Sequence, residues 1–195
     1  VLAYDLGAVA RWAGEEPQAI RELQHLLFDP DELLAWRGVE ALGVAAAEIG
    51  RARPDAVREL LRRTLWLMND ESGGLLWHGP QVMGAVLAHA PAASAEFGPV
   101  LASFLEEEPF RAGTRWGLWR LSFAVPAVVR EAARELRASF ADPDPAIRGL
   151  AALALRGAGA EVPDLSGDRA ALAVFDFRTG ALRETTVADA AAGAI

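Results

Sequence analysis

The stretch Asn69–Gln81 holds the side chains best suited to binding a ligand. Asp70 and Glu71 offer carboxylates, and Trp77 and His78 follow after paired glycines. A polar loop that contains glycine and leads into a helix can build a ligand site from such residues. The alternative is that the loop only joins two helices, with Trp77 packed between them and His78 in a structural position. We favour this alternative, and the ligand site remains a second hypothesis.

A second cluster combines aromatic and arginine side chains near residue 116. On a helix, residues four apart are neighbours, so Arg111 lies beside Arg115 and Trp116 beside Arg120. With Trp119 these groups could hold a nucleobase or another aromatic ligand by stacking and cation–π contact. Aromatic side chains are more often buried, and base excision would need a basic groove. We therefore expect packing rather than nucleic-acid chemistry here.

Other types of reactive site lack support in the sequence. There is no Cys, which excludes disulfides, thiolate metal sites and a Cys nucleophile. None of His25, His78 and His89 has a second His three or four residues away, so zinc-type spacing is missing. No serine elbow, phosphate loop or dinucleotide fingerprint occurs. The sequence predicts no catalytic residue, no metal ligand and no cofactor.

Composition favours one globular domain with an acidic surface. The chain has 195 residues, 52% hydrophobic and 24% charged, and a net charge of -8. This is long enough to bury a real core, and no apolar run approaches the ~20 residues of a membrane span. The negative charge disfavours a general nucleic-acid binder. No secretory signal is visible, so we expect a cytoplasmic protein.

Four similar blocks indicate a repeat of paired helices. The blocks Trp36–Gly43, Trp77–Gly84, Phe110–Gly117 and Ile147–Ala154 each open on a large apolar residue, followed by Arg or His. Their starts are 41, 33 and 37 residues apart, a spacing typical of helix-pair repeats. The small residue at the eighth position lets neighbouring helices approach closely.

The second position of each block predicts a ladder of cations along one edge of the stack. Such a ladder could bind an acidic segment or a carboxylate ligand. The favoured alternative is that each cation pairs with an acid of the preceding loop. The ladder consists of Arg37, His78, Arg111 and Arg148, and the candidate acids are Asp31, Asp70, Glu107 and Asp144.

Further helices and a hairpin complete the expected elements. Second helices are predicted at 55–68, 94–105 and 127–140, and a first helix pair at 2–13 and 18–28, about nine helices in all. After residue 159, segments 171–177 and 181–187 read as strands joined by a turn with Gly180. We expect 1–160 to form the repeat domain and 161–195 a hairpin that caps the end of the stack.

The block Asp142–Leu155 resembles a HEAT-like repeat of the bacterial phycobilisome-lyase type. It has Asp-Pro, then Ile147 and Arg148, then small and apolar residues that lead to Ala-Leu. The Trp36 block matches through Ala41-Leu42-Gly43. The two middle blocks depart from the pattern, since His78 replaces the Arg and Pro80 enters the first turn. The resemblance spans residues 1–159 and implies an α-solenoid. Most family members are protein-interaction scaffolds, a minority handle bilins, and a related fold excises alkylated bases.

The sequence thus predicts an all-α, HEAT-like α-solenoid with a small C-terminal hairpin, acting as a non-catalytic protein-interaction scaffold. The expected face follows the second helices, where Arg21, Arg58, Arg62, Arg130 and Arg134 alternate with Glu16, Glu59, Glu131 and Glu135. Mixed charge predicts a specific protein partner. A small-ligand or enzymatic site around Asp70–His78 and Trp116 is the alternative, which a deep shared pocket would favour. The candidate binding residues are Arg37, Asp70, Glu71, Trp77, His78, Arg111, Arg115, Trp116, Arg58, Arg62 and Arg134.

Overall fold

A computed structural model of the chain describes residues 1–16, 18–69 and 76–195. This part of the chain is mainly helical, with eleven α-helices and one two-stranded antiparallel sheet. The helices are α1 (Leu6–Glu15), α2 (Ala19–His25), α3 (Glu32–Ala52), α4 (Pro54–Met68), α5 (Gly79–His89), α6 (Ser94–Ser103), α7 (Arg111–Ser122), α8 (Pro126–Glu131), α9 (Ala133–Ala138), α10 (Pro145–Gly157) and α11 (Val187–Ala192). The strands are β1 (Ala171–Asp176) and β2 (Ala181–Thr186).

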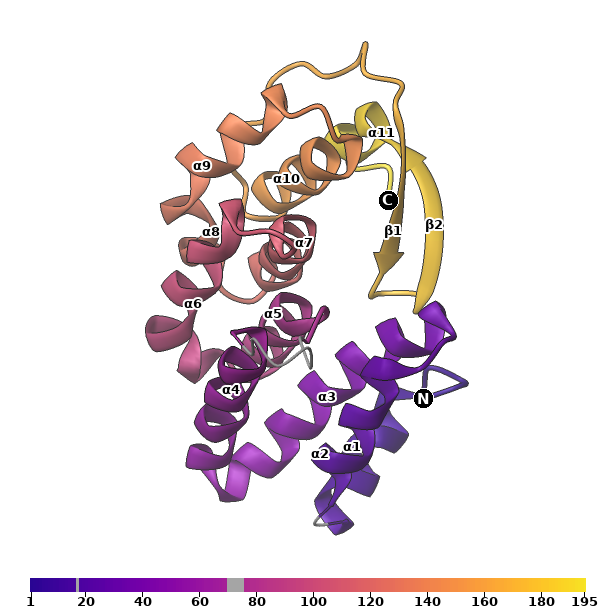
Figure 1. Cartoon of the computed structure of the whole chain (residues 1–195), viewed down its shortest axis with the longest axis vertical. Coiled ribbons are helices and arrows are strands. Elements are labelled where there is room, and N and C mark those ends of the chain that lie inside the picture. The colour runs from indigo at the N-terminus through magenta and orange to yellow at the C-terminus, as the bar shows by residue number, and fades with distance from the viewer. Residues whose placement is uncertain (17, 70–75) are drawn as a thin grey trace.

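The helices from α3 to α10 lie in two rows. We call α3, α5, α7 and α10 the inner row, because each packs against the next along the molecule. Helices α4, α6, α8 and α9 form the outer row on one side of it (Figure 1). Close contact in the inner row depends on small residues: a Cβ on Gly84 of α5 would overlap the backbone of Gly117 on α7.

Local sequence explains where the inner helices begin. Asp31 accepts hydrogen bonds from the backbone N–H groups of Leu33 and Leu34 and so caps α3. Asp144 caps α10 in the same way, with Pro145 in the first turn. Pro54 opens α4 directly after α3 ends, which keeps the two helices antiparallel neighbours.

The helix count differs from the nine that the sequence predicts. The expected helix at 127–140 is divided into α8 and α9, because Ala132 leaves helical geometry at φ -86° and ψ 8°. The chain also adds α11 after the hairpin, capped by the Thr186 hydroxyl, which accepts from the N–H of Asp189. No helix of the described residues combines the length and apolar character that a bilayer crossing requires.

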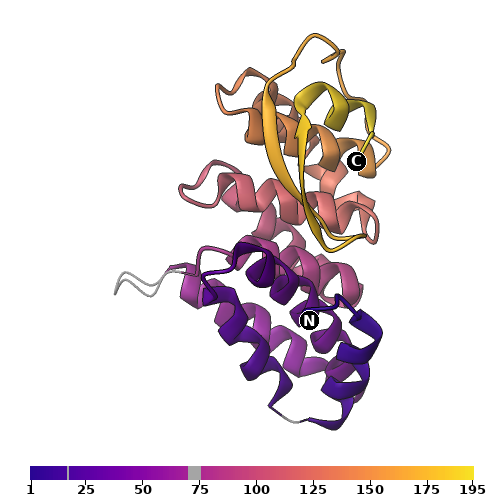
Figure 2. The same cartoon turned by 90° about the vertical axis from the view of Figure 1, so that its right-hand side faces the viewer.

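The two C-terminal strands form the predicted hairpin. β1 and β2 pair antiparallel with Phe175 opposite Leu182, and Gly180 in the turn has φ +66°. Helix α11 packs on α10, the last helix of the inner row. The hairpin reaches further than a cap: it runs along the open side of the inner row to the N-terminal segment (Figures 1 and 2).

Candidate functional site

An aromatic centre lies between the inner row and the hairpin. Trp36 of α3 stacks on Phe175 of β1 with ring centroids 5.3 Å apart, and Trp36 and Trp116 are 4.9 Å apart. Trp119 and Phe177 approach to 4.9 Å. The Trp116 Nε1–H donates to the Phe175 carbonyl at 2.9 Å, and Trp116 is only 1% exposed. The face that could have gripped a ligand is therefore filled by the chain's own hairpin.

Beside the aromatic centre, three polar side chains meet from three inner helices. Arg120 of α7 contacts both carboxylate oxygens of Glu40 on α3, Nε to Oε1 at 2.7 Å and Nη2 to Oε2 at 3.3 Å. His89 at the end of α5 lies 3.1 Å from the same Oε2. The Arg120 guanidinium also covers the ring of Phe177 at 4.5 Å. Glu40 is 1% exposed, so its charge depends on these partners.

Sequence reasoning assigned no role to Glu40 and grouped His89 only with the isolated histidines. The reason is that the three partners are separated by 49 and 31 residues and meet only through packing of the inner row. One signal was present, since Glu40 stands between Val39 and Ala41 on the apolar stripe of α3. A charged residue at such a position demands a buried partner.

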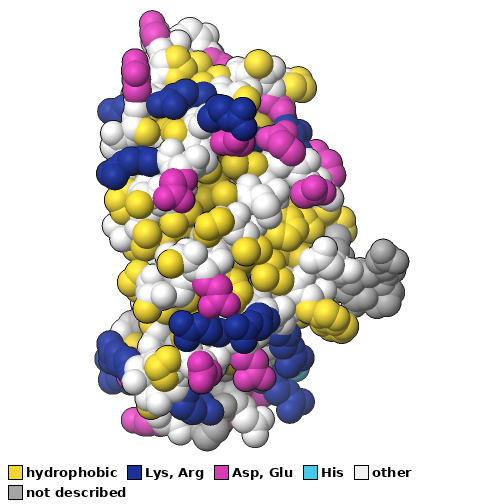
Figure 3. Space-filling view, turned by 90° about the vertical axis from the view of Figure 1, so that its left-hand side faces the viewer, with side chains coloured by type: hydrophobic (Ala, Val, Ile, Leu, Met, Phe, Trp, Pro, Cys, Tyr) yellow, Lys and Arg dark blue, Asp and Glu magenta, His cyan; other side chains and the backbone are white. Residues whose placement is uncertain are grey.

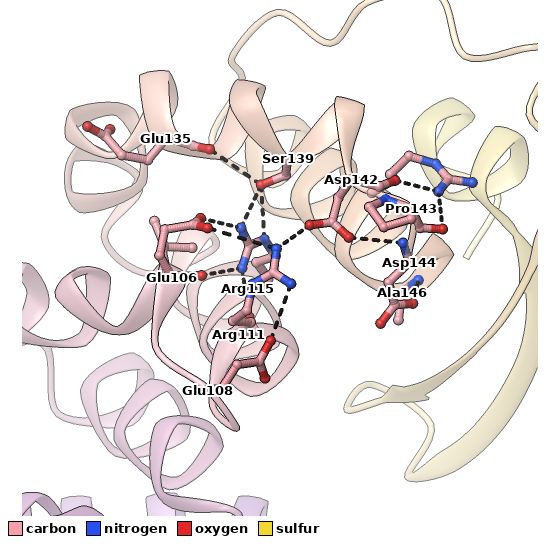
Figure 4. A network of polar contacts seen from close by, with 12 residues as sticks. Glu106, Glu108, Arg111, Arg115, Glu135, Ser139, Asp142, Pro143, Asp144 and Ala146 are labelled. Carbon is pink, nitrogen blue, oxygen red and sulfur yellow. Dashed lines mark hydrogen bonds and ion pairs between the residues drawn. The ribbon is translucent and has the colours of Figure 1, made fainter.

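Arg115 of α7 is the centre of a second network (Figure 4). The side chain is fully buried, and its guanidinium donates to Ser139 Oγ, the Leu105 carbonyl at 2.6 Å and Glu106 Oε1 at 2.9 Å. Burial lowers the pKa of Arg115, and Glu106 opposes this shift. Arg115 therefore ties α7 to the segments that end α6 and α9, and its donors face protein groups.

Arg111 completes this network on its exposed side. Arg111 pairs with Glu108 Oε1 at 3.3 Å and with the carboxylate of Asp142. The backbone N–H of Asp144 and the Arg111 guanidinium lower the pKa of Asp142. Arg111 and Arg115 are thus brought together as the sequence predicts, but they hold adjacent loops in place.

The predicted ladder of cations does not form a free row. Arg37 donates from Nε to the Gly180 carbonyl at 2.9 Å, and Arg148 pairs with Asp168 at 2.7 Å and with the Asp142 carbonyl. The acids that we expected as their partners, Asp31 and Asp144, cap helix N-termini instead. A cap uses the carboxylate where backbone N–H groups are unsatisfied, which explains the different pairing.

The stretch 69–81 is placed only in part. Asp70 and Glu71 lie outside the described residues. His78 packs edge-on to Trp36 at 5.6 Å, and burial lowers its pKa, while Glu32 and a hydrogen bond to the Leu27 carbonyl oppose the shift. The expectation that Trp77 packs between helices is wrong, because its side chain is 63% exposed. Trp77 and the buried Trp116 therefore do not share an open pocket.

Four of the five arginines expected on the interaction face, all except Arg21, have intramolecular partners among the described residues. Arg58 and Arg62 of α4 both hold Glu96 of α6, at 3.0 Å and 3.1 Å. Arg130 donates to the Ala158 carbonyl at 2.9 Å, and Arg134 pairs with the adjacent Glu135. These contacts join the outer helices to one another and to α10, and they leave the face mixed in sign.

No family model, curated protein or solved structure matches the chain. Across 1–16, 18–69 and 76–195, no group of three or more acidic or histidine side chains could hold a metal ion. The geometry itself must therefore carry any functional argument.

Proposed function

We infer that this chain is a non-catalytic protein-interaction module that binds a partner protein on its outer row. In this proposal the helix pairs are HEAT-like repeats. The resemblance of Asp142–Leu155 to such a repeat supports this reading. The ordered packing of α3, α5, α7 and α10, each on the next, supports it as well.

One observation carries the proposal: the C-terminal hairpin occupies the open side of the inner row. Phe175 and Phe177 cover Trp36, Trp116 and Trp119 there. On the opposite side, no other described element covers α4, α6, α8 and α9 (Figure 1). The outer row is thus a surface that the fold leaves available to a partner.

The outer face also has the chemistry of a specific interface. Figure 3 shows apolar side chains across its middle, bordered above and below by charges of both signs. Apolar area supplies affinity, and a mixed pattern of charge selects one partner over others. The alternative of a ligand or enzymatic site needs an open pocket that joins Trp77, His78 and Trp116, and the burial of Trp116 favours the interaction module instead.

An affinity pull-down with three baits tests this function. The outer-row bait carries Glu59→Arg, Arg134→Glu and Arg137→Glu, three exposed positions on α4 and α9. Arg58 and Arg62 are left intact, because reversing them would break their shared contact with Glu96. The control bait carries Glu184→Arg, Arg11→Glu and Arg169→Glu, which gives the same change of net charge away from the outer row.

We expect one protein to be captured from native lysate at equal yield by the wild-type and control baits and to be lost with the outer-row bait. Circular dichroism of the three baits should be identical, since all substituted side chains are exposed. Equal capture by all three baits, or loss with the control alone, would contradict a partner site on the outer row.

A further inference from the structure

A groove of about 330 Å³ lies where α2, α4 and the segment before α5 meet. Its apolar floor consists of Leu27 in the turn after α2, Leu67 of α4, and Leu76 before α5. Leu27 and Leu76 are buried, and the Leu76 N–H donates to the Leu67 carbonyl at 3.2 Å. The floor is therefore part of the folded core, so the groove has a fixed shape.

The rim of this α2–α4 groove is basic. Arg21, His25 and Arg63 line it together with the neutral Gln24, and none of the lining residues within 1–16, 18–69 and 76–195 is acidic. Arg58 and Arg62, which lie on α4 with Arg63, both form ion pairs. Among the described residues, neither Arg21 nor Arg63 forms one. Two guanidinium groups beside an apolar floor can recognise carboxylates by charge-assisted hydrogen bonds.

One exposed aromatic side chain lines the groove, and two others follow or precede lining residues in the chain. Phe28, which lines it, is 64% exposed. Trp66 and Trp77 are 66% and 63% exposed, and they are the chain neighbours of the lining residues Leu67 and Leu76. Large exposed aromatics beside a groove are typical of protein interfaces. The apolar floor and the exposed ring of Phe28 together suit a peptide segment better than a small carboxylate.

A second groove gives a contrast within the same molecule. Between α6 and the helices α8 and α9, about 370 Å³ is lined by Pro99, Leu105 and Val128, with Glu106, Glu131 and Glu135 at its edge. The floor of this second groove is also apolar, but the charged residues at its edge are acidic, whereas those of the α2–α4 groove are basic. An acidic ligand is thus directed to the α2–α4 groove by the sign of the rim.

We propose that the α2–α4 groove binds an acidic segment of a partner protein, anchored by a large apolar side chain on the groove floor. Its carboxylates pair with Arg21 and Arg63, and its apolar residues cover Phe28. The net charge of -8 repels such a segment at long range, but screening confines that repulsion to about 8 Å at physiological salt. Attraction within the groove then decides binding. This inference rests on the proposed interaction function and names the chemistry of the partner.

Titration of the whole chain with three labelled peptides of about 12 residues tests the proposal. The first alternates Glu with Leu and Phe, the second replaces Glu by Lys, and the third keeps Glu but replaces the apolar residues by Ser. We expect saturable binding of the first peptide only. Higher salt, from about 0.05 M to about 0.5 M, should weaken that binding because screening reduces the attraction.

Variants locate the site. Arg21→Glu with Arg63→Glu should weaken binding of the first peptide at least tenfold, and Phe28→Ala about threefold to tenfold. Arg11→Glu with Arg169→Glu makes the same charge change at two exposed positions that do not line the groove, and should leave affinity within about twofold. All five positions are exposed, so the variants should fold, and urea unfolding checks this.

Several results would overturn the proposal. These are equal binding of the Lys peptide, equal binding of the Ser peptide, an equal loss in the control variant with Arg11→Glu and Arg169→Glu, or saturable binding of decanoate without any peptide binding. The last result would assign the groove to a small carboxylate. If the peptides fail while the outer-row bait still loses its partner in the pull-down, the proposed function stands and only this inference is wrong.

Discussion

Glu40 illustrates how a single buried charge is held in this protein. Its carboxylate is 1% exposed and is shared between Arg120 and His89. Glu40→Gln removes the charge but keeps the shape, which leaves the guanidinium of Arg120 without its counter-ion. Breaking a buried pair in this way costs about 3–5 kcal/mol. We expect the free energy of unfolding to fall by about that amount in urea titrations.

The double variant Glu40→Gln with Arg120→Met provides the control. Removal of both charges should recover most of the lost stability, because no unpaired ion then remains buried. If the double variant is as unstable as Glu40→Gln alone, the loss comes from packing and the ion pair is not its cause. Glu59→Gln, at an exposed position of α4, should change the unfolding free energy by less than about 0.5 kcal/mol.

His78 should make stability depend on pH. Burial lowers its pKa in the folded chain below the ordinary value of about 6.5. The unfolded chain then binds the proton more readily, so the unfolding free energy should decrease as the pH falls below about 6.5. His78→Phe keeps an aromatic ring against Trp36 and removes the titration. We expect a smaller slope in that variant when urea unfolding is compared between about pH 7 and pH 5.

His25→Phe is the matched control for this measurement, since His25 is exposed. It should leave the slope close to that of the wild type. Identical slopes in all three proteins would show that His78 is equally easy to protonate in the folded and unfolded chain.

At the scale of single residues, the sequence identified types of side chain better than their partners. It placed Arg111 beside Arg115 correctly, because neighbours on one helix follow from spacing alone. It could not connect Glu40 with Arg120, which lies 80 residues away on another helix. Nor could it show that Arg37 would bond to the Gly180 carbonyl, a contact that depends on where the hairpin docks.

Among the elements, the hairpin has the largest effect on what the inner row can do. Phe175 is fully buried against Trp36 and Trp116, while its cross-strand neighbour Leu182 is exposed. Phe175→Ala should lower the unfolding free energy by about 3–5 kcal/mol, whereas Leu182→Ala should lower it by less than about 1 kcal/mol. Chemical denaturation measures both.

Tryptophan fluorescence distinguishes this packing from a general loss of structure. Phe175→Ala should shift the emission to the red under native conditions, because Trp36 and Trp116 lose their apolar cover. An unshifted spectrum together with unchanged stability would mean that the hairpin does not seal the aromatic centre. Leu182→Ala should leave the spectrum unchanged.

The elements themselves were largely predictable from local signals. Helical periodicity marked α4, and the Gly180 turn marked the hairpin. The division of 127–140 into α8 and α9 was not predictable, because residues 131–134 are Glu-Ala-Ala-Arg, all good helix formers. Tertiary packing overrides propensity there. The position of the hairpin along the inner row could not be predicted from the sequence either, because a strand pattern does not specify what the strand packs against.

Across the whole molecule, the two ends of the chain are joined by what we call the N-terminal clasp. Tyr4 donates its hydroxyl to the Phe177 carbonyl, and Arg37 bonds to the carbonyls of Gly180 and Leu2. Burial, and next the charge of Glu40, raises the pKa of Tyr4, so the phenol keeps the proton that it donates. Three short segments far apart in sequence are thereby held together (Figure 2).

Removing the clasp should loosen one part of the molecule only. In Arg37→Met we expect faster amide hydrogen exchange in residues 1–5 and in β1 and β2, with unchanged exchange in α6, α8 and α9. Arg51→Met, at an exposed site paired with Glu48, is the control and should alter neither region. Uniformly faster exchange across all helices in Arg37→Met would mean that the clasp supports the entire fold instead.

The clasp has a mechanical consequence. A row of helix pairs, each packed mainly on its neighbours, stretches and bends like a spring. The hairpin runs from α10 and α11 along the row, and the clasp fastens its turn to the N-terminal segment, so together they act as a strut in parallel with that spring. A force applied between α1 and α11 would therefore meet a stiff molecule until the clasp ruptures. Beyond that point the rows should extend gradually under much lower load.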